Sequence, residues 1–343
     1  MNSAWQQRLQ SVGALIEDGI VQNFGDPQAE REAARSGSVL ADLSHLGVLE
    51  VAGEDSETFL QGQLSCDVHS VAAGSSSYGS CCTPKGRMLA DFLLWRASNG
   101  FLMALSRSVI ATVQKRLKMY VLRSKVQVSD ASGSVVLLGV SAAAATDALG
   151  SVLTGLSTHE ARRFGEGSTA ISLPGERLLL AVPAEGAAKL WEKLAATLRP
   201  VGTPVWEWLD IRNGIPLVTA KTQEQFLPQM TNLELLGGVS FKKGCFTGQE
   251  VVARAQHLGK VKRRMFLMHT DDDHTPPSPG DEIFSDDIPG QASGAVVNAQ
   301  AAPGGGYDLL AVVHHSSRES STVHLRSSDG PVLRFLDLPY AVA

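Results

Sequence analysis

The sequence lacks the features that mark several classes of protein. It has only four cysteines in 343 residues, and none lies in a CxxC motif or in another spacing typical of a zinc site. It has no run of 18 apolar residues, which argues against a transmembrane helix. Residues 1–15 carry charge and glutamines where a signal peptide would need an apolar run. We therefore expect a protein of the reducing cytoplasm, with no membrane partner.

Composition and charge narrow the choice further. Charged residues make up 19% of the chain and hydrophobic residues 43%, as in ordinary globular proteins. These values exclude a disordered chain, a collagen-like fibre and a coiled coil. The net charge is −5, whereas proteins that wrap nucleic acid are usually basic. The length suggests two or three domains around a large core.

The apolar pattern predicts two similar α+β units between residues 38 and 205. Each shows the order strand, helix, strand, strand, helix, which is typical of the split βαβ arrangement. The first unit is expected over about 38–130 and the second over about 131–205, after a helical lead-in at 1–37. The expected strands are 39–51, 88–95, 101–105, 125–128, 135–140, 169–173 and 178–182, and the expected helices are 55–64, 109–120, 142–153 and 183–198.

The remaining sequence changes character near residue 263. A helix is predicted over 205–212, and the chain is then irregular up to residue 240. Short strands between Gly- and Pro-rich turns predict a small β-barrel or sandwich over 263–343, with strands at 265–269, 294–298, 309–314 and 322–325. The acidic stretch 271–290 is predicted to be a solvated surface loop.

One segment, ending at Glu250, carries the clearest candidate chemistry. Thr247 and Glu250 have the spacing of a capping box, which predicts that a helix starts there. Cys245 would then lie just before a helix N-terminus, where the partial positive charge favours a thiolate, and Lys242 and Lys243 act in the same direction. The alternatives are that Cys245 is a small buried hydrophobic residue and that Glu250 is only a cap.

Residues 241–264 are also strongly basic. They contain seven basic residues and one acidic residue, which leaves the rest of the chain at −11. Such a patch could hold a polyanionic tail or an RNA backbone, or it could be a solvated helix face. Gly244 and Gly248 would allow the backbone to approach a ligand closely, and free amides at the helix start could hold a carboxylate.

The string Lys-Gly-Cys-Phe-Thr-Gly-Gln-Glu at 243–250 resembles the signature of the YgfZ family. Residues 60–68 resemble that family's N-terminal block, and 214–233 resemble the block that leads into the cysteine motif. The resemblance spans roughly residues 40–265. The family is itself similar to the T-protein, the aminomethyltransferase of the glycine cleavage system.

This resemblance implies a fold and a function. The fold would be an α+β, T-protein-like ring of two ferredoxin-like (split βαβ) units within 1–262, with 206–262 as the cysteine-motif segment, and a C-terminal β-barrel over 263–343. The function would be folate binding, with tetrahydrofolate or a derivative as the ligand. The family is linked to the maintenance of iron–sulfur enzymes and, through them, to tRNA modification.

The resemblance also assigns roles to single residues. The family's motif cysteine falls on Cys245, which we expect to be the functional thiol. A tryptophan associated with folate falls on Trp206, and a second aromatic position falls on Leu46, where leucine departs from the pattern. Asp91 would occupy the position of a carboxylate that faces folate in T-proteins. The other expected folate contacts are Lys243, Gln249, Glu250, Arg254 and Lys260.

These assignments are chemically reasonable but have alternatives. A pterin could stack on Trp206 and donate hydrogen bonds to Asp91, and the glutamate tail would suit Lys243 or Arg254. However, a tryptophan on a helix is often a core residue, and Asp91 could face solvent on the polar side of its strand.

Three functions therefore remain open. The first is a folate-binding factor for the assembly or repair of iron–sulfur client proteins, with Cys245 as its thiol and no metal site. One cysteine cannot hold a cluster, so Cys66, Cys81 and Cys82 would matter only if the fold brings them near. The alternative is a tetrahydrofolate-dependent aminomethyltransferase. Direct tRNA binding is the third, which the acidic remainder of the chain disfavours.

Overall fold

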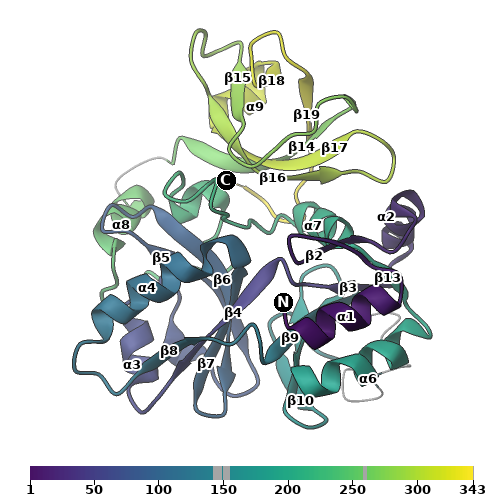
Figure 1. Cartoon of the computed structure of the whole chain (residues 1–343). Helices are drawn as coiled ribbons and strands as arrows, with labels where there is room; N and C mark the ends of the chain where they lie inside the picture. The colour runs from purple at the N-terminus through teal and green to yellow at the C-terminus, as the bar shows by residue number, and fades with distance from the viewer. Residues whose placement is uncertain (142–148, 150–154, 258–260, 343) are drawn as a thin grey trace. The chain divides into compact units, whose positions relative to one another are not determined.

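The structure is a computed structural model that describes residues 1–141, 149, 155–257 and 261–342. The chain forms two compact units, each assembled from segments far apart in the sequence (Figure 1). Unit 1 consists of Met1–Phe59, Val68–Ser77 and Leu93–Trp206, and unit 2 consists of Leu60–Asp67, Tyr78–Phe92 and Glu207–Ala343. The predicted helix over 142–153 lies outside the described residues.

The first predicted α+β unit is confirmed as a five-stranded sheet in the order β5-β6-β7-β4-β8. Without β5 at the edge, this is the strand order of a ferredoxin-like unit. Asn99 and Gly100 lie at the turn of the hairpin between β6 and β7. Gly100 has a positive φ of 140° there. The strands are β4 (Leu46–Ala52), β5 (Ser76–Cys82), β6 (Met88–Ala97), β7 (Gly100–Ser106) and β8 (Gln127–Asp130), and the helices are α3 (Ser56–Gln61) and α4 (Ile110–Val121).

The second sheet contains two strands more than a ferredoxin-like unit, β10 at its edge and β3 in its interior. Its order is β10-β11-β12-β9-β3-β13, so β3 separates the two strands that a ferredoxin-like unit would pair. β3 is antiparallel to β9 and parallel to β13. Residues 174–176 form the hairpin turn that joins β11 and β12, the strands predicted over 169–173 and 178–182. The strands are β3 (Val39–Asp42), β9 (Val135–Ser141), β10 (Ala161–Phe164), β11 (Ser168–Leu173), β12 (Arg177–Pro183) and β13 (Arg199–Val201).

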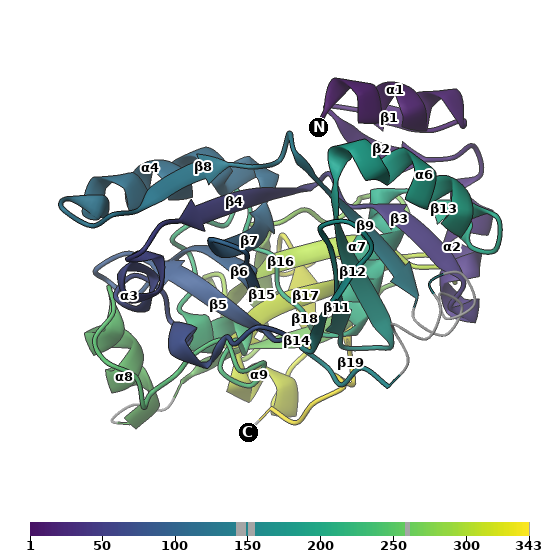
Figure 2. The ribbon, with the colours of Figure 1, turned by 90° about the horizontal axis from the view of Figure 1, so that it is seen from below.

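Two helices pack side by side against this second sheet (Figure 2). They are α1 (Ser3–Ser11) and α6 (Ala184–Ala195). Ala187, Trp191 and Leu194 recur at helical spacing in α6 and are all buried. The ring of Trp191 contacts that of Trp5 edge-on, with the centroids 5.6 Å apart. These three residues of α6 thus form part of the apolar core against the second sheet, together with Trp5 and Leu9 of α1.

Two predictions near the N-terminus are wrong. The lead-in at 1–37 is not helical throughout, because a hairpin lies between α1 and α2 (Pro27–Ser36); its strands are β1 (Leu15–Glu17) and β2 (Ile20–Asn23). Asp18 and Gly19 both have positive φ there, as a tight hairpin turn requires. The single strand predicted over 39–51 is two strands in different sheets. The Asp42 carboxylate accepts the Ser44 amide in a side-chain turn that breaks the strand.

The C-terminal part forms the predicted β-barrel, which is closed and has six strands in the order β14-β17-β16-β15-β18-β19. The acidic stretch 271–290 is not only a surface loop, because β15 lies inside it and buries Ile283 in the barrel core. The sequence analysis also missed β19. The strands are β14 (Arg263–Thr270), β15 (Glu282–Ser285), β16 (Gly294–Ala301), β17 (Tyr307–His314), β18 (Val323–Leu325) and β19 (Val332–Leu336), and α9 (His315–Ser320) follows β17.

The segment before the barrel carries the elements that matter for the site. Helix α7 (Thr203–Arg212) ends at the Gly-Ile-Pro stop, as predicted, and the irregular stretch after it contains only the short helix η4 (Pro228–Thr231) among its described elements. Helix α8 (Gln249–His257) follows the cysteine motif. No helix in the part of the chain that the structure describes is long and apolar enough to cross a bilayer.

Candidate functional site

Cys245 lies on an exposed loop of unit 2. The predicted helix is present, but it begins at Gln249, four residues after the cysteine. Thr247 and Gly248 form a turn before it, so Cys245 is farther from the helix N-terminus than the capping-box spacing suggested.

The side chains next in the motif point to structural roles. Phe246 is buried with Val239 and Val252 in a small apolar cluster. The exposed Glu250 carboxylate pairs with Arg254 at 2.8 Å, one helical turn on. Gln249 is half-buried at the first position of α8. These contacts anchor the loop on its C-terminal side.

Gly248 is required by packing against another turn of unit 2. It has φ 87°, and a Cβ there would lie 2.4 Å from the carbonyl oxygen of Thr83 and 3.0 Å from Cα of Gly86. Gly244 differs, because a Cβ at that position would meet open space. The absence of a side chain at Gly248 thus lets the backbone approach Thr83 and Gly86, whereas the sequence analysis expected it to approach a ligand.

Lys243 lies on the N-terminal side of the cysteine and is half-buried. Its Nζ donates to the main-chain oxygens of Gln61, Leu64 and Cys66 at 2.7, 2.7 and 2.8 Å. An ammonium group has only three donors, so in this structure none is left for the tail of a folate. Two segments that resemble YgfZ blocks, 60–68 and 243–250, are therefore in direct contact.

The block at 214–233 also supports the motif. Gln229 donates from Nε2 to the Val252 carbonyl oxygen of α8 at 2.6 Å, and Asn232 donates to the Met265 carbonyl oxygen of β14 at 2.8 Å. Arg264 is buried and pairs with Glu234. The basic segment 241–264 is consequently not one exposed surface. Two of its cations, Lys243 and Arg264, are bound to acceptors inside the fold.

Asp91 is the second predicted site residue with a distinctive environment. It lies on β6, its side chain is buried, and its Oδ1 accepts the amide of Val218 at 2.7 Å. Burial raises the pKa of Asp91 to about 7, and the charge of Asp210 acts in the same direction. The carboxyl group does not face solvent, and near neutral pH it exists both as acid and as carboxylate.

A cavity of about 240 Å³ lies beside the 217–219 segment of unit 2. Burial, and then the charge of Asp210, raises the pKa of Glu207 to about 7, although Gln300 donates to its Oε2 at 2.5 Å. No cation is among the described residues that line the cavity, which are Glu207, Asp210, Ile211, Ile215, Leu217, Thr219, Pro279, Asn298, Ala299 and Gln300. A carboxyl group of raised pKa, such as that of Glu207, beside a cavity with both polar and apolar walls is typical of a ligand site.

The sequence analysis missed Glu207 and Asp210. They are three residues apart on α7, a spacing that places both on one helix face. That spacing was the available signal, but only the fold shows that the face borders a cavity rather than water.

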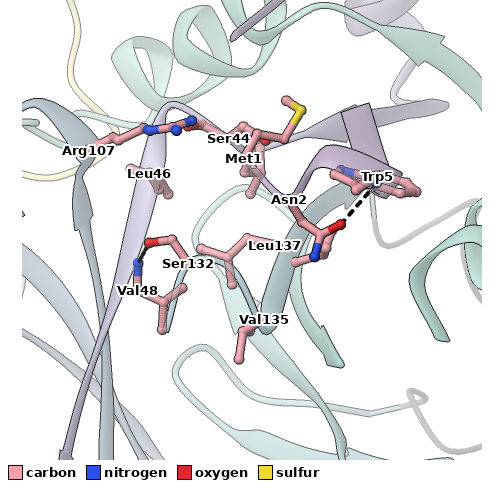
Figure 3. A pocket seen from close by; sticks show the side chains of 12 residues that line it. Met1, Asn2, Trp5, Ser44, Leu46, Val48, Arg107, Ser132, Val135 and Leu137 are labelled. Atoms are coloured by element: carbon pink, nitrogen blue, oxygen red, sulfur yellow. Dashed lines mark hydrogen bonds between the residues drawn. The ribbon is translucent and has the colours of Figure 1, made fainter. Parts of the chain in front are cut away.

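Trp206 and Leu46 lie in unit 1. The ring of Trp206 is 1% exposed, Gly139 packs against it, and the guanidinium of Arg177 lies 4.8 Å from its centroid. A ligand could stack on this ring only if these neighbours moved. Leu46 is half-buried and lines a small cavity of about 20 Å³ with Arg107 (Figure 3), room for about one water molecule.

The four cysteines differ sharply in environment. Cys245 is exposed, whereas Cys66, Cys81 and Cys82 are buried. Burial raises the pKa of the Cys82 thiol to about 12. Within the described ranges, no group of three or more His, Cys, Asp or Glu side chains could hold a metal ion. Lys260, expected to bind the folate tail, lies outside the described residues.

Comparison with known proteins gives three findings. Residues 20–173 match the family of the GCVT N-terminal domain. The tRNA-modifying protein YgfZ of Edwardsiella ictaluri (strain 93-146) is 33% identical over 297 residues, which cover 85% of this chain and 89% of that protein. The crystal structure of the glycine cleavage system aminomethyltransferase T from Bartonella henselae superposes with a TM-score of 0.81 at 19% identity, covering 99% of this chain and 97% of that one. At that identity the superposition shows a shared fold.

Proposed function

Because the chain belongs to the YgfZ family, we propose that it is a cytoplasmic folate-binding factor that supports the assembly or repair of iron–sulfur enzymes. Cys245 is its functional thiol in this proposal. The relative from Edwardsiella ictaluri is named a tRNA-modifying protein. We propose that this chain affects tRNA modification indirectly, through iron–sulfur enzymes that modify tRNA.

The observation that carries the proposal is the contrast between Cys245 and the other three cysteines. Cys245 is exposed on a loop that is anchored on both sides, whereas Cys66, Cys81 and Cys82 are buried. A buried thiol is inert toward large partners, whereas an exposed thiol on a fixed loop can meet one. In this proposal Cys245 is therefore the cysteine whose thiol meets a client protein.

The folate site is proposed at Asp91 and the cavity lined by α7. A pterin presents ring and amino N–H groups, which suit carboxyl oxygens, and its flat ring suits apolar walls. Glu207 and Asp210 line the cavity and supply carboxyl groups, and Ile211 and Ile215 supply apolar surface. Asp91 does not line it, but it accepts the amide of Val218, which lies in the chain between the lining residues Leu217 and Thr219. The residues present therefore fit tetrahydrofolate or a derivative, with the pterin held by hydrogen bonds rather than by stacking on Trp206.

For the glutamate tail, Arg254 is the more available of the two expected cations that the structure describes. It is exposed and shares its guanidinium with Glu250 in a solvent-exposed pair, which is weak and readily exchanged for another carboxylate. Lys243 has its three donors engaged elsewhere. Gln249 and Glu250 are adjacent on α8 and would border the tail.

One observation favours the alternative of a tetrahydrofolate-dependent aminomethyltransferase. A buried carboxyl with a pKa of about 7, such as Asp91, is suited to general acid–base catalysis at neutral pH. That reaction would need no cysteine. Formation of methylenetetrahydrofolate from an aminomethyl donor, lost in Asp91→Asn and retained in Cys245→Ala, would establish it.

The proposal is tested by complementation in cells that lack the endogenous protein, with the activity of an iron–sulfur enzyme as the readout. Cys245→Ala should fold normally and fail to restore that activity, while Cys82→Ala, with its buried thiol, serves as the matched control. In parallel, calorimetric titration with tetrahydrofolate should show saturable binding that Asp91→Ala weakens and Cys245→Ala does not. Full restoration of enzyme activity by Cys245→Ala would refute the role of the thiol.

A further inference from the structure

Lys243 is bound by a segment that precedes it by about 180 positions. All three of its N–H donors reach main-chain oxygens there, those of Gln61, Leu64 and Cys66, at 2.7–2.8 Å. Hydrogen bonds from an ammonium group are stronger than neutral ones, and three directed at one segment fix it in position. Lys243 is thus a cross-link between two loops of unit 2, two residues before Cys245.

One of the three oxygens that Lys243 binds lies at the end of a helix. Gln61 is the last residue of α3, and the final carbonyl groups of a helix have no partner within it. A lysine at a helix C-terminus satisfies such oxygens and interacts favourably with the helix dipole. Loss of the ammonium would remove three charge-assisted hydrogen bonds to Gln61, Leu64 and Cys66, which destabilises the local arrangement.

The other side of the cysteine is held by Phe246. Its ring is buried with Val239 and Val252, and Nζ of Lys243 lies 5.4 Å from the ring centroid. Cys245 itself stays exposed between these two anchored residues. The backbone of the cysteine is therefore constrained, whereas its thiol is open to a partner.

We propose that Lys243 is a positioning residue for the thiol of Cys245. It fastens the cysteine loop to residues 61–66, so that the thiol is presented from a rigid backbone. This inference rests on the proposed role of Cys245 and explains why a lysine precedes the cysteine by two positions. A glutamate-tail contact would need only a charge at that position, whereas a cross-link needs three directed donors.

The test compares Lys243→Met with Lys242→Met. Lys242 is exposed, and its replacement removes the same charge from the same loop, so it controls for electrostatics. A nitroxide label attached to Cys245, the exposed cysteine, reports the motion of the loop by electron paramagnetic resonance. Hydrogen exchange of 61–66 and 244–247 reports whether the two segments are coupled.

In Lys243→Met, amide exchange should rise in both segments together, by about tenfold or more, as expected for the loss of charge-assisted hydrogen bonds. The nitroxide spectrum should sharpen while the melting temperature of unit 1 changes little. Lys242→Met should leave both readouts at the wild-type level. Unchanged exchange and an unchanged spectrum in Lys243→Met would overturn the inference.

If Lys243→Met does not fold, the inference can be tested by lysine acetylation of the wild-type protein. Burial lowers the pKa of Lys243 to about 8, which by itself would speed its acetylation. Because three acceptors enclose its amine, Lys243 should nevertheless react more slowly than Lys242 under brief acetylation. Equal rates would overturn the inference. Neither readout depends on iron–sulfur enzyme activity, so failure of the cross-link and failure of the proposed function are separately visible.

Discussion

The buried carboxyl of Asp91 should make the stability of the protein depend on pH, and Asp91→Asn should remove its share of that dependence while leaving the share of Glu207. Burial raises the folded-state pKa from the ordinary value of 3.8 to about 7. Between these two pH values the folded chain binds a proton that the unfolded chain has released. The stability that this group contributes is therefore fully present below pH 4 and is lost as the pH rises through 7.

The magnitude follows from the size of the shift. One pKa unit corresponds to about 1.4 kcal/mol, so the loss is roughly 4 kcal/mol above pH 7 and about 3 kcal/mol between pH 5 and pH 8. The side chain is 5% exposed, so solvent screening reduces this value little. Asparagine keeps an oxygen for the Val218 amide but cannot ionise. The free energy of unfolding of Asp91→Asn should therefore exceed that of the wild type by an amount that grows with pH.

The assay is urea unfolding followed by tryptophan fluorescence at several pH values from 5 to 8. Glu166→Gln, at an exposed carboxyl in the turn between β10 and β11, is the control for a general effect of charge removal. The reasoning is refuted if the difference between Asp91→Asn and the wild type stays constant over this range, or if it has the opposite sign at pH 8.

Two further substitutions test the packing. Gly248→Ala should destabilise the protein by about 1–3 kcal/mol, because it places a Cβ 2.4 Å from Thr83 O at a positive φ, whereas Gly244→Ala should change the urea midpoint little; equal effects would contradict the packing role of Gly248. Trp206→Ala should cost about 3–5 kcal/mol in the free energy of unfolding, as expected for a fully buried ring. If this variant kept wild-type stability but lost folate binding, Trp206 would be a ligand contact and not a core residue.

Local signals in the sequence predicted much of the fold. The strands on either side of the Asn99-Gly100 turn, those on either side of residues 174–176 and the helix predicted over 183–198 depend on neighbours within a few residues, and the structure contains them. A local signal also exists at Asp18-Gly19, a pair typical of a tight hairpin turn. The prediction of a helical lead-in at 1–37 is wrong at this turn.

The strand pairing of two segments depends on residues far away in the chain and could not be predicted from local sequence patterns. The segment 39–51 was a plausible single strand, but its first part pairs with β9 and its second with β7. The acidic stretch 271–290 supplies β15 because the barrel needs a strand between β16 and β18 to close. Strand pairing is decided by partners that are far away in the chain.

The candidate site shows the same division. The string at 243–250 was sufficient to single out Cys245 and to indicate the family, because residue identity carries that information. The partners of Lys243, the burial of Asp91 and the cavity beside Glu207 came only from the tertiary structure. The pKa of a carboxyl group and the hydrogen bonds of an amine depend on burial and on neighbouring polar groups. Segments far away in the sequence supply these surroundings.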